Sequence, residues 1–278
     1  MKLQQLRYAC EVARRNLSVS AAAEALFTSQ PGLSRQIQAL EAELGVAIFV
    51  RHGKRLTGVT EPGRTVLAIA ERMLADAANL KRAGEDFAAR DLGALTIATT
   101  HTQARYALPK TVAAFKRRHP KVQLYIHQGN PTQICEQVER GEADLCIATE
   151  QIAQHPALVA LPCYRWNRCV VVPPKHALLA SRPLTLEAMD ADVIKTYVEL
   201  GLGVGIMASM AFDAKRDRHL RAIDASHLFP SSTTRLGVKR GAYLRRYAYD
   251  FIAMFAPQLP REAVAKALAG EAGSDYEL

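Results

Sequence analysis

Apolar residues recur at helical intervals near the start of the chain and predict a pair of packed helices. Four of them form one face of the second predicted helix: Leu33, Ile37, Leu40 and Leu44. The helix before it offers small side chains for close packing: Ala21, Ala22, Ala25 and Leu26. Ser29 can cap the second helix, and Pro31 fits its first turn, where a backbone N–H has no helical partner to lose. The pattern therefore predicts two short helices in contact, joined by a turn.

The opposite face of the second predicted helix is polar. It carries side chains that can hydrogen-bond DNA base edges or phosphates: Ser29, Gln30, Ser34, Arg35 and Gln38. In the major groove, arginine matches guanine and glutamine matches adenine. A face that is merely solvated would also be polar, so this helix by itself does not decide between the two interpretations.

The next segment predicts a hairpin with a basic tip. Apolar residues at 48–50 precede Arg51, and a turn at Gly53 is followed by Lys54 and Arg55. Three cations beside the polar helix suit contact with phosphates, which position a protein on DNA without reading its sequence. Two helices, a turn and a basic hairpin are the order of a winged helix-turn-helix, which places its second helix in the major groove. We therefore expect residues 1–60 to bind double-stranded DNA.

One long helix is predicted from Glu61 to Arg90, because no strong helix breaker follows Pro62. Its apolar and small residues step by four and three alternately: Val66, Ala70, Met73, Ala77, Leu80, Gly84 and Phe87. A period of about 3.5 residues is typical of a helix that pairs with another helix. Residues 61–90 therefore predict a linker helix that joins two copies of the chain, although packing on its own domain would give a similar pattern.

Strands and helices alternate in residues 91–278. Segments 95–98, 122–127 and 144–148 predict short strands, with helical patterns at 105–118 and 132–140 between them. This order predicts an α/β domain with a parallel sheet, following the helical and winged N-terminal part. Ligands of such sheets bind beyond the carboxyl ends of the strands.

Polar residues follow these predicted strands. Thr100, Thr102 and Gln103 follow the first strand, and Thr149 follows the third. Free backbone N–H groups at a helix start, with hydroxyl and amide donors around them, can hold an anion such as sulfate without a metal or a lysine. Threonine at a helix start can also be only a cap. Three further residues are additional candidates for ligand contact: His101, Thr132 and Trp166.

The first 90 residues resemble the LysR-type transcriptional regulators, and residues 21–51, AAAEALFTSQPGLSRQIQALEAELGVAIFVR, carry the resemblance. Segments of the second half are similar to the cysteine-regulon group of that family: 99–109, 127–134, 146–150, 161–168 and 190–212. The resemblance implies a winged helix-turn-helix, a linker helix and a periplasmic-binding-protein-like effector domain with two subdomains. It also implies assembly as a dimer or tetramer.

The resemblance implies a function in controlling genes of sulfur assimilation and cysteine biosynthesis. The implied ligands are an acetylserine-type inducer and, opposing it, sulfate, thiosulfate or a sulfated nucleotide. Four positions match the anion-contacting residues of the cysteine-regulon group: Thr100, Thr102, Gln103 and Thr149. Two alternatives stay open: a regulator of a different sulfur-compound pathway, and a truncated regulator with an impaired ligand response.

The second alternative arises from a break in the family pattern at residues 183–195, PLTLEAMDADVIK. The chain passes there from the start of the second subdomain to a helix that comes much later in family members. A βαβ-sized segment of roughly 30 or more residues, which carries another ligand loop in the family, is missing near residues 187–190. We expect the second subdomain to keep too few strands for a sheet of ordinary width.

Composition narrows the class of protein further. A formal net charge of +9 and a pI of about 9.4 favour a polyanionic partner. Five cysteines, an odd count without a C-x-x-C pair, and a start without an apolar run argue against a secreted disulfide protein, a zinc site and a signal peptide. No apolar stretch is long enough to span a membrane. We therefore expect a cytoplasmic protein with no metal, no cofactor and no membrane partner.

The residues fit two other classes of function less well. A solute-binding protein would suit the fold predicted from residue 95 onward, but it would leave residues 1–60 without a role. An enzyme acting on a small sulfur or acyl-serine compound would need a nucleophile, a general base and an acidic residue that orients the base. No such set is recognisable in the sequence, so no catalytic residue is predicted.

Overall fold

The computed structural model describes residues 1–53, 55–88, 92–174 and 190–270. The predicted DNA contact Lys54 and the predicted break before Asp190 lie outside these described residues. Contacts divide the chain into two compact units, Met1–Glu85 and Asp86–Leu278. Within the described ranges, no helix combines the length and the apolar character needed to cross a membrane.

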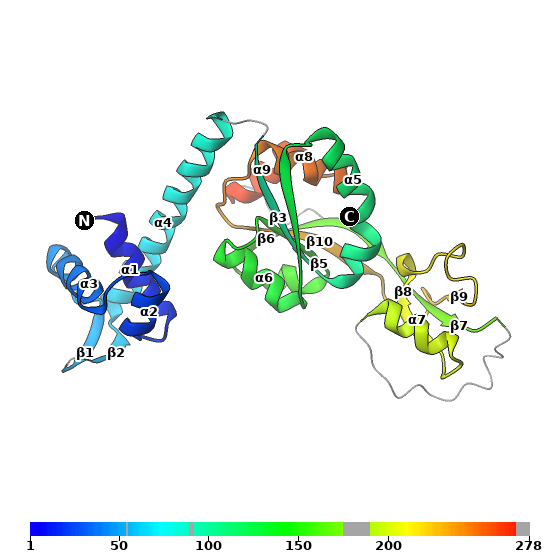
Figure 1. Ribbon diagram of the computed structural model, residues 1–278, viewed down its shortest axis with the longest axis horizontal. Helices are drawn as coiled ribbons and strands as arrows, with labels where there is room; N and C mark the ends of the chain where they lie inside the picture. The colour runs from blue at the N-terminus through cyan, green and yellow to red at the C-terminus, as the bar shows by residue number, and fades with distance from the viewer. Residues whose placement is uncertain (54, 89–91, 175–189, 271–278) are drawn as a thin grey trace. The chain divides into compact units, whose positions relative to one another are not determined.

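The first unit consists of helices followed by a hairpin and one long helix (Figure 1). Its elements are α1 (Leu3–Arg14), α2 (Val19–Ala25), α3 (Gln30–Leu44), β1 (Phe49–His52), β2 (Arg55–Val59) and most of α4 (Glu61–Ala88). Side chains from all the helices and the hairpin form one buried core, in which Leu33, Ile37 and Leu40 of α3 are at most 1% exposed. Leu44 was predicted to join them and does not. It is 38% exposed, because α3 ends there and Gly45 takes a left-handed conformation.

Side-chain caps set the starts of the helices in this unit. The Ser18 hydroxyl accepts a hydrogen bond from the backbone N–H of Ala21 at the start of α2. The Ser29 hydroxyl accepts one from the backbone N–H of Gly32 at 3.3 Å, and Pro31 lies in the first turn of α3, as its sequence predicts.

The apolar seam of α4 has two parts with different surroundings. Val66 and Ala70 pack into the core of the first unit. Further along, Met73 is 36% exposed, and Leu80 and Phe87 are each 77% exposed. The part of α4 around Val66 and Ala70 therefore packs on its own domain. The part around Leu80 and Phe87 is available to a partner helix.

The second unit is built on a five-stranded sheet with the order β4-β3-β5-β10-β6 (Figure 1). Its strands are β3 (Gly93–Thr99), β4 (Val122–Gln128), β5 (Leu145–Ala148), β6 (Leu158–Trp166) and β10 (Ser232–Lys239). Strand β3 pairs parallel with β4 and β5, whereas β10 pairs antiparallel with β5 and β6. The three strands predicted from the sequence are β3, β4 and β5.

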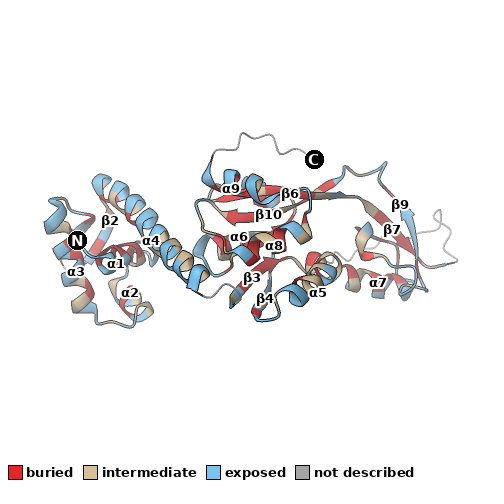
Figure 2. Ribbon diagram, turned by 90° about the horizontal axis from the view of Figure 1, so that it is seen from above, coloured by how far each residue is buried: buried red, intermediate tan, exposed pale blue. Residues whose placement is uncertain are grey.

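Helices cover both faces of this sheet (Figure 2). They are the turn η1 (Gln103–Ala107), α5 (Leu108–Arg118), α6 (Pro131–Arg140), the turn η2 (Glu150–Gln154), α8 (Arg246–Phe255) and α9 (Arg261–Ala269). Alternate strand residues such as Ile97 and Ile147 are buried with α5, α8 and α9. Their neighbours Ala98 and Cys146 are buried with α6 on the other face.

A second, smaller sheet has the order β8-β7-β9. Its elements are β7 (Arg168–Val172), α7 (Ala191–Glu199), β8 (Gly205–Ala208), the turn η4 (Ser209–Ala211) and β9 (Arg221–Asp224). Both neighbouring strands pair antiparallel with β7. The described residues thus give this subdomain a three-stranded sheet, narrower than the sheet before it.

Candidate functional site

Helix α3 turns its predicted DNA-contacting face away from the core. Ser29, Gln30, Arg35 and Gln38 are exposed, and Ser34 is half-buried. The amide oxygen of Gln30 accepts a hydrogen bond from the Ser20 hydroxyl of α2 at 3.2 Å. The residues that pack α3 and the residues proposed to touch DNA therefore lie on opposite sides of one helix.

The hairpin β1–β2 is fixed to α3 by a carboxylate that the sequence did not indicate. One oxygen of Glu41 accepts the backbone N–H groups of Ile48 at 2.8 Å and Phe49 at 3.1 Å. The other oxygen accepts the Arg51 guanidinium at 2.7 Å. Arg51 therefore makes an ion pair with α3, and both Arg51 and Arg55 are exposed. No spacing rule marks Glu41, since its role depends on where the hairpin folds back.

The second candidate site lies at the carboxyl edge of the five-stranded sheet. In the register of the parallel strands, Thr99 is level with Gln128 of β4 and Ile147 of β5. Thr100 and Thr149 therefore leave adjacent strands at the same edge. Thr132 lies exposed in the first turn of α6, which follows β4, and Trp166 ends β6 at this edge, beyond β10.

The helix that begins at this edge is irregular. Its first turn, η1, is a π-helical turn that leads into α5. Thr100 and Thr102 are half-buried there, and the Thr102 side chain makes no capping hydrogen bond. The interpretation of Thr102 as a simple cap is therefore not what the geometry shows. A widened first turn of this kind is frequent at functional sites.

Gln103 is a buried polar residue of this edge, at 2% exposure. Its amide nitrogen donates a hydrogen bond to the Thr234 hydroxyl at 3.1 Å, and its amide oxygen accepts one from the Tyr164 hydroxyl. Burial raises the pKa of Tyr164, which keeps this hydroxyl a donor. Neither partner was predicted from the sequence, although the hydroxyl-rich run at 231–234 was a signal for Thr234.

A polar network joins this edge to the smaller sheet. Arg105 donates to Asp192 at 3.0 Å, and the Tyr106 hydroxyl donates to the same carboxylate. Lys195, at 8% exposure, lies 3.0 Å from Asp217 and 3.3 Å from the Tyr106 hydroxyl. Burial disfavours the charge of Lys195, but the hydrogen bonds that its ammonium donates to Asp217 and to the Tyr106 hydroxyl outweigh burial and raise the pKa of Lys195.

His101 lies beside this network and forms, with two carboxylates, a group whose spacing could hold a metal ion among the described residues. Its Nε2 atom is 3.1 Å from Asp190 and 3.9 Å from Asp192, and its Nδ1 atom is 3.2 Å from the Gln128 amide oxygen. Asp192 is already neutralised by Arg105 and is also 3.7 Å from Lys195. Two neighbouring cations oppose a metal ion at this position, so we assign Asp192 to ion pairing with Arg105 and Lys195.

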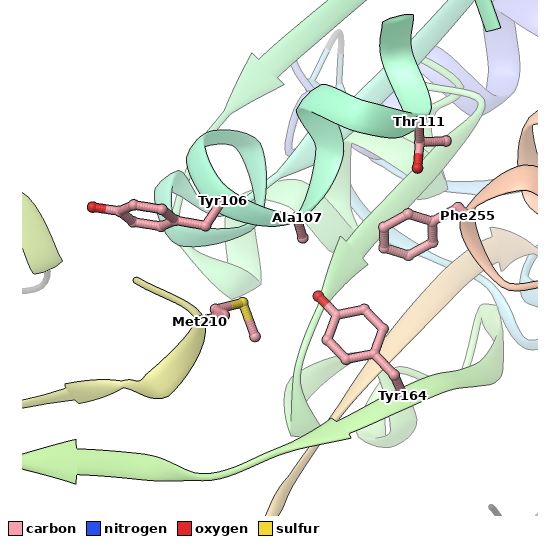
Figure 3. A pocket seen from close by; sticks show the side chains of 6 residues that line it. All are labelled: Tyr106, Ala107, Thr111, Tyr164, Met210 and Phe255. Atoms are coloured by element: carbon pink, nitrogen blue, oxygen red, sulfur yellow. The ribbon is translucent and has the colours of Figure 1, made fainter. Parts of the chain in front are cut away.

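An open hollow of about 270 Å³ is bordered by Tyr164, the hydrogen-bond partner of Gln103 (Figure 3 shows Tyr164 and the hollow's other lining residues). Its lining is mainly aromatic and apolar: Tyr106, Ala107, Thr111, Tyr164, Met210 and Phe255. The Tyr164 ring packs edge-on against Phe255 with ring centroids 5.9 Å apart. Tyr164 thus borders the hollow and also hydrogen-bonds Gln103.

Trp166 and the five cysteines make contacts that are explained by packing within the fold. The indole of Trp166 stacks with the Arg168 guanidinium, which is 5.4 Å from its ring centroid. All five cysteines are buried and free of disulfides. Burial raises the pKa of the Cys10 thiol to about 11 and that of Cys163 to about 12. Neither of these two thiols is a reactive thiolate at neutral pH.

Comparison with known proteins places both units in one family. Residues 3–64 match the family described as "Bacterial regulatory helix-turn-helix protein, lysR family", and residues 88–191 match "LysR substrate binding domain". The chain therefore belongs to the LysR family of DNA-binding transcriptional regulators. Members of this family are regulators and not enzymes, which confirms the class and the fold predicted from the sequence.

Particular regulators are similar over the whole chain. The transcriptional regulator CysB of Burkholderia cenocepacia is 50% identical, with all of both chains covered. The regulator SsuR of the same organism is 48% identical over 95% of this chain and 98% of its own. The solved cofactor-binding domain of the Cbl regulator superposes with a TM-score of 0.60 and 36% identity, covering 64% of this chain and 93% of that domain.

The same comparisons bear on the predicted break. The alignment with the Burkholderia CysB spans 314 positions, against 278 residues in this chain, and covers all of both. About 36 positions of that relative therefore have no counterpart here. The match to the substrate-binding domain ends at residue 191, next to the place where the sequence departs from the family pattern.

Proposed function

We propose that this regulator controls genes of sulfur assimilation and cysteine biosynthesis in response to a small ligand. The observation that carries the proposal is the start of η1, where Thr100, Thr102 and Gln103 surround a helix N-terminus at the edge of the sheet. Similarity to regulators named CysB, SsuR and Cbl supports the choice of pathway. The proposed ligands are an acetylserine-type inducer and an anion such as sulfate or thiosulfate.

The proposal assigns a separate role to each of three segments of the chain. Residues 1–60 bind promoter DNA, 61–90 join two copies, and 91–278 bind the effector. Base contacts come from the exposed face of α3, and phosphate contacts come from the hairpin. The proposed DNA-binding residues are Ser29, Gln30, Ser34, Arg35, Gln38, Arg51, Lys54 and Arg55. A protein that acts on promoters in this way works in the cytoplasm.

In the effector site, hydroxyl and backbone donors hold the anion without a metal. Thr100 and Thr102 contribute from the start of η1, and Thr149 contributes from the end of β5. Gln103 keeps one amide N–H for the ligand, because its two hydrogen bonds use only one N–H and the oxygen. His101, Thr132 and Trp166 are additional candidates at the same edge.

The narrow second sheet favours the alternative of a truncated regulator with an impaired ligand response. About 36 positions of a full-length relative have no counterpart in this chain. A regulator that lacks one wall of its ligand cleft would bind DNA without a normal ligand response. Under this alternative the chain is still a DNA-binding member of the family, and only its response to the ligand differs.

A thermal-shift titration separates the proposal from this alternative. Purified protein is titrated with sulfate, thiosulfate and N-acetylserine, with chloride at matched ionic strength as control. A ligand that binds the folded state raises its melting temperature by mass action. A saturable rise that is lost in Thr100→Ala supports the proposed site, and a cooperative melt without any rise supports the alternative.

A further inference from the structure

Ser20 and Gln30 lie at the starts of the two helices of the helix-turn-helix. Ser20 is the second residue of α2, and Gln30 is the first residue of α3. The Ser20 hydroxyl donates a hydrogen bond to the amide oxygen of Gln30 at 3.2 Å, and both residues are exposed. A side-chain contact therefore joins the first turn of α2 to the residue that begins the proposed DNA-reading face of α3.

The backbone on both sides of this hydrogen bond is fixed by packing. Ala22 of α2 and Leu33 of α3 are both 0% exposed in the same core. The turn between the helices is closed by backbone hydrogen bonds, and the Ser29 hydroxyl caps the start of α3. Ser20 and Gln30 are therefore held close together without any movement of either helix.

The direction of the Gln30 amide decides which base edges it can read. A glutamine amide has an oxygen that accepts hydrogen bonds and an NH₂ group that donates them. Glutamine reads adenine with both groups, because N6 of adenine donates and N7 accepts. In this chain the Gln30 oxygen is directed to Ser20. The NH₂ group lies on the other side of the planar amide, and it offers donors only.

We propose that Ser20 is a positioning residue that fixes the Gln30 amide, so that Gln30 reads guanine and not adenine. Guanine presents two acceptors, N7 and O6, at its major-groove edge. The inference rests on the proposed role of Gln30 as a base contact, and it adds the base that Gln30 selects and the residue that sets the choice. It replaces the adenine match that glutamine suggests from sequence. Fixing the side chain before binding also reduces the entropy that is lost on DNA binding.

The base preference at one position of the DNA site tests the proposal. The duplex that the full chain selects most strongly from a random pool is prepared with each base pair exchanged in turn, and fluorescence anisotropy gives the dissociation constants. Gln30→Ala identifies the contacted position, because the variant loses the base preference of the unmodified chain there. At this position we expect the unmodified chain to prefer guanine to adenine about tenfold.

Variants of Ser20 then separate positioning from a general effect on binding. Ser20→Ala frees the amide, so the preference for guanine over adenine should fall to about twofold or less. Ser20→Thr keeps a hydroxyl and should retain the preference. Glu24→Ala, at another exposed position of α2, is the control and should leave the preference unchanged. A merely structural role of Ser20 would weaken binding to every duplex equally and would not change the ratio.

The possible failures of the two proposals differ. An unchanged ratio in Ser20→Ala, or a preference of the unmodified chain for a base other than guanine, overturns the role of Ser20 and leaves Gln30 a base contact. If Gln30→Ala loses its preference at no position, Gln30 is not a base contact, and the inference falls with that assignment.

Discussion

Gln103 connects three parts of the effector domain through one side chain. It belongs to the first turn after β3, and its hydrogen bonds reach Tyr164 on β6 and Thr234 on β10. A buried amide is costly when it loses a partner, because water cannot replace the missing hydrogen bond. The glutamine therefore fixes the position of the turn after β3, from which the proposed ligand contacts come.

Replacement of Thr234 by valine tests the structural role of Gln103, because it removes the hydroxyl that accepts the Gln103 hydrogen bond. Thr234→Val keeps the shape and leaves the amide of Gln103 without its acceptor, so we expect a loss of about 1–3 kcal/mol in the free energy of unfolding. Urea denaturation measures the loss. Thr233→Val, at the half-buried neighbouring position, is the control. Equal stability of the two variants would show that the Gln103 bond contributes little.

The ionisation of Asp192 makes the stability of the fold depend on pH in a defined direction. Burial opposes its charge, but the Tyr106 hydroxyl and the Arg105 and Lys195 cations outweigh burial and lower its pKa below 3.8. A carboxyl with a lowered folded-state pKa stabilises the fold above its ordinary pKa, and this stabilisation is lost as pH falls through the folded-state value.

Asp192→Asn should therefore melt below the unmodified chain at neutral pH. The gap in melting temperature should stay constant down to about pH 3.8 and close only below it. Calorimetry between pH 7 and pH 2 measures the gap. Glu199→Gln, an exposed position at the end of α7, should produce no gap. A gap for Asp192→Asn that opens as pH falls would contradict the assigned ion pairs.

At the scale of elements, α3 and its hairpin illustrate what periodicity determines. Leu33, Ile37 and Leu40 lie in the core as their spacing predicts, because a helix with one apolar face buries that face. Leu44 shares the spacing and stays exposed, since the helix ends before the core does. The contact of Glu41 with the hairpin involves residues brought together by the fold, so no local pattern indicates it.

The exposed face of α3 predicts a specific effect on DNA binding. Arg35→Ala should weaken binding to a promoter sequence by about 1–3 kcal/mol if the side chain contacts a base. Binding to random DNA at the same salt concentration should change much less. Fluorescence anisotropy with both DNAs measures the difference, and Gln36→Ala on the same helix is the control. Equal losses on both DNAs would indicate that Arg35 contacts phosphates and not bases.

At the scale of the whole molecule, the distal half of α4 predicts self-association. Leu80 and Phe87 remain exposed on a helix whose proximal half is already packed. Two copies joined there would present two recognition helices to successive major grooves, about 34 Å apart. A symmetric pair of this kind binds a symmetric DNA site.

Leu80→Glu should weaken this association at least tenfold. Burying a leucine contributes about 1.5–3 kcal/mol, and the glutamate would also place a charge at the contact. Sedimentation equilibrium measures the dissociation constant. Ala78→Glu introduces the same charge at an exposed position outside the seam and should leave the constant unchanged. Equal weakening by both variants would exclude α4 as the contact.

The sequence by itself determined the elements whose signals are local. The cap at Ser29, the apolar face of α3 and the strand–helix order after residue 95 follow from residues close together along the chain. The tertiary structure alone decided which distant residues meet. The hydrogen bonds of Gln103 with Thr234 and of Arg105 with Asp192 join segments far apart in sequence. Chain folding sets these contacts, because hydrogen bonds and packing depend on distance in space.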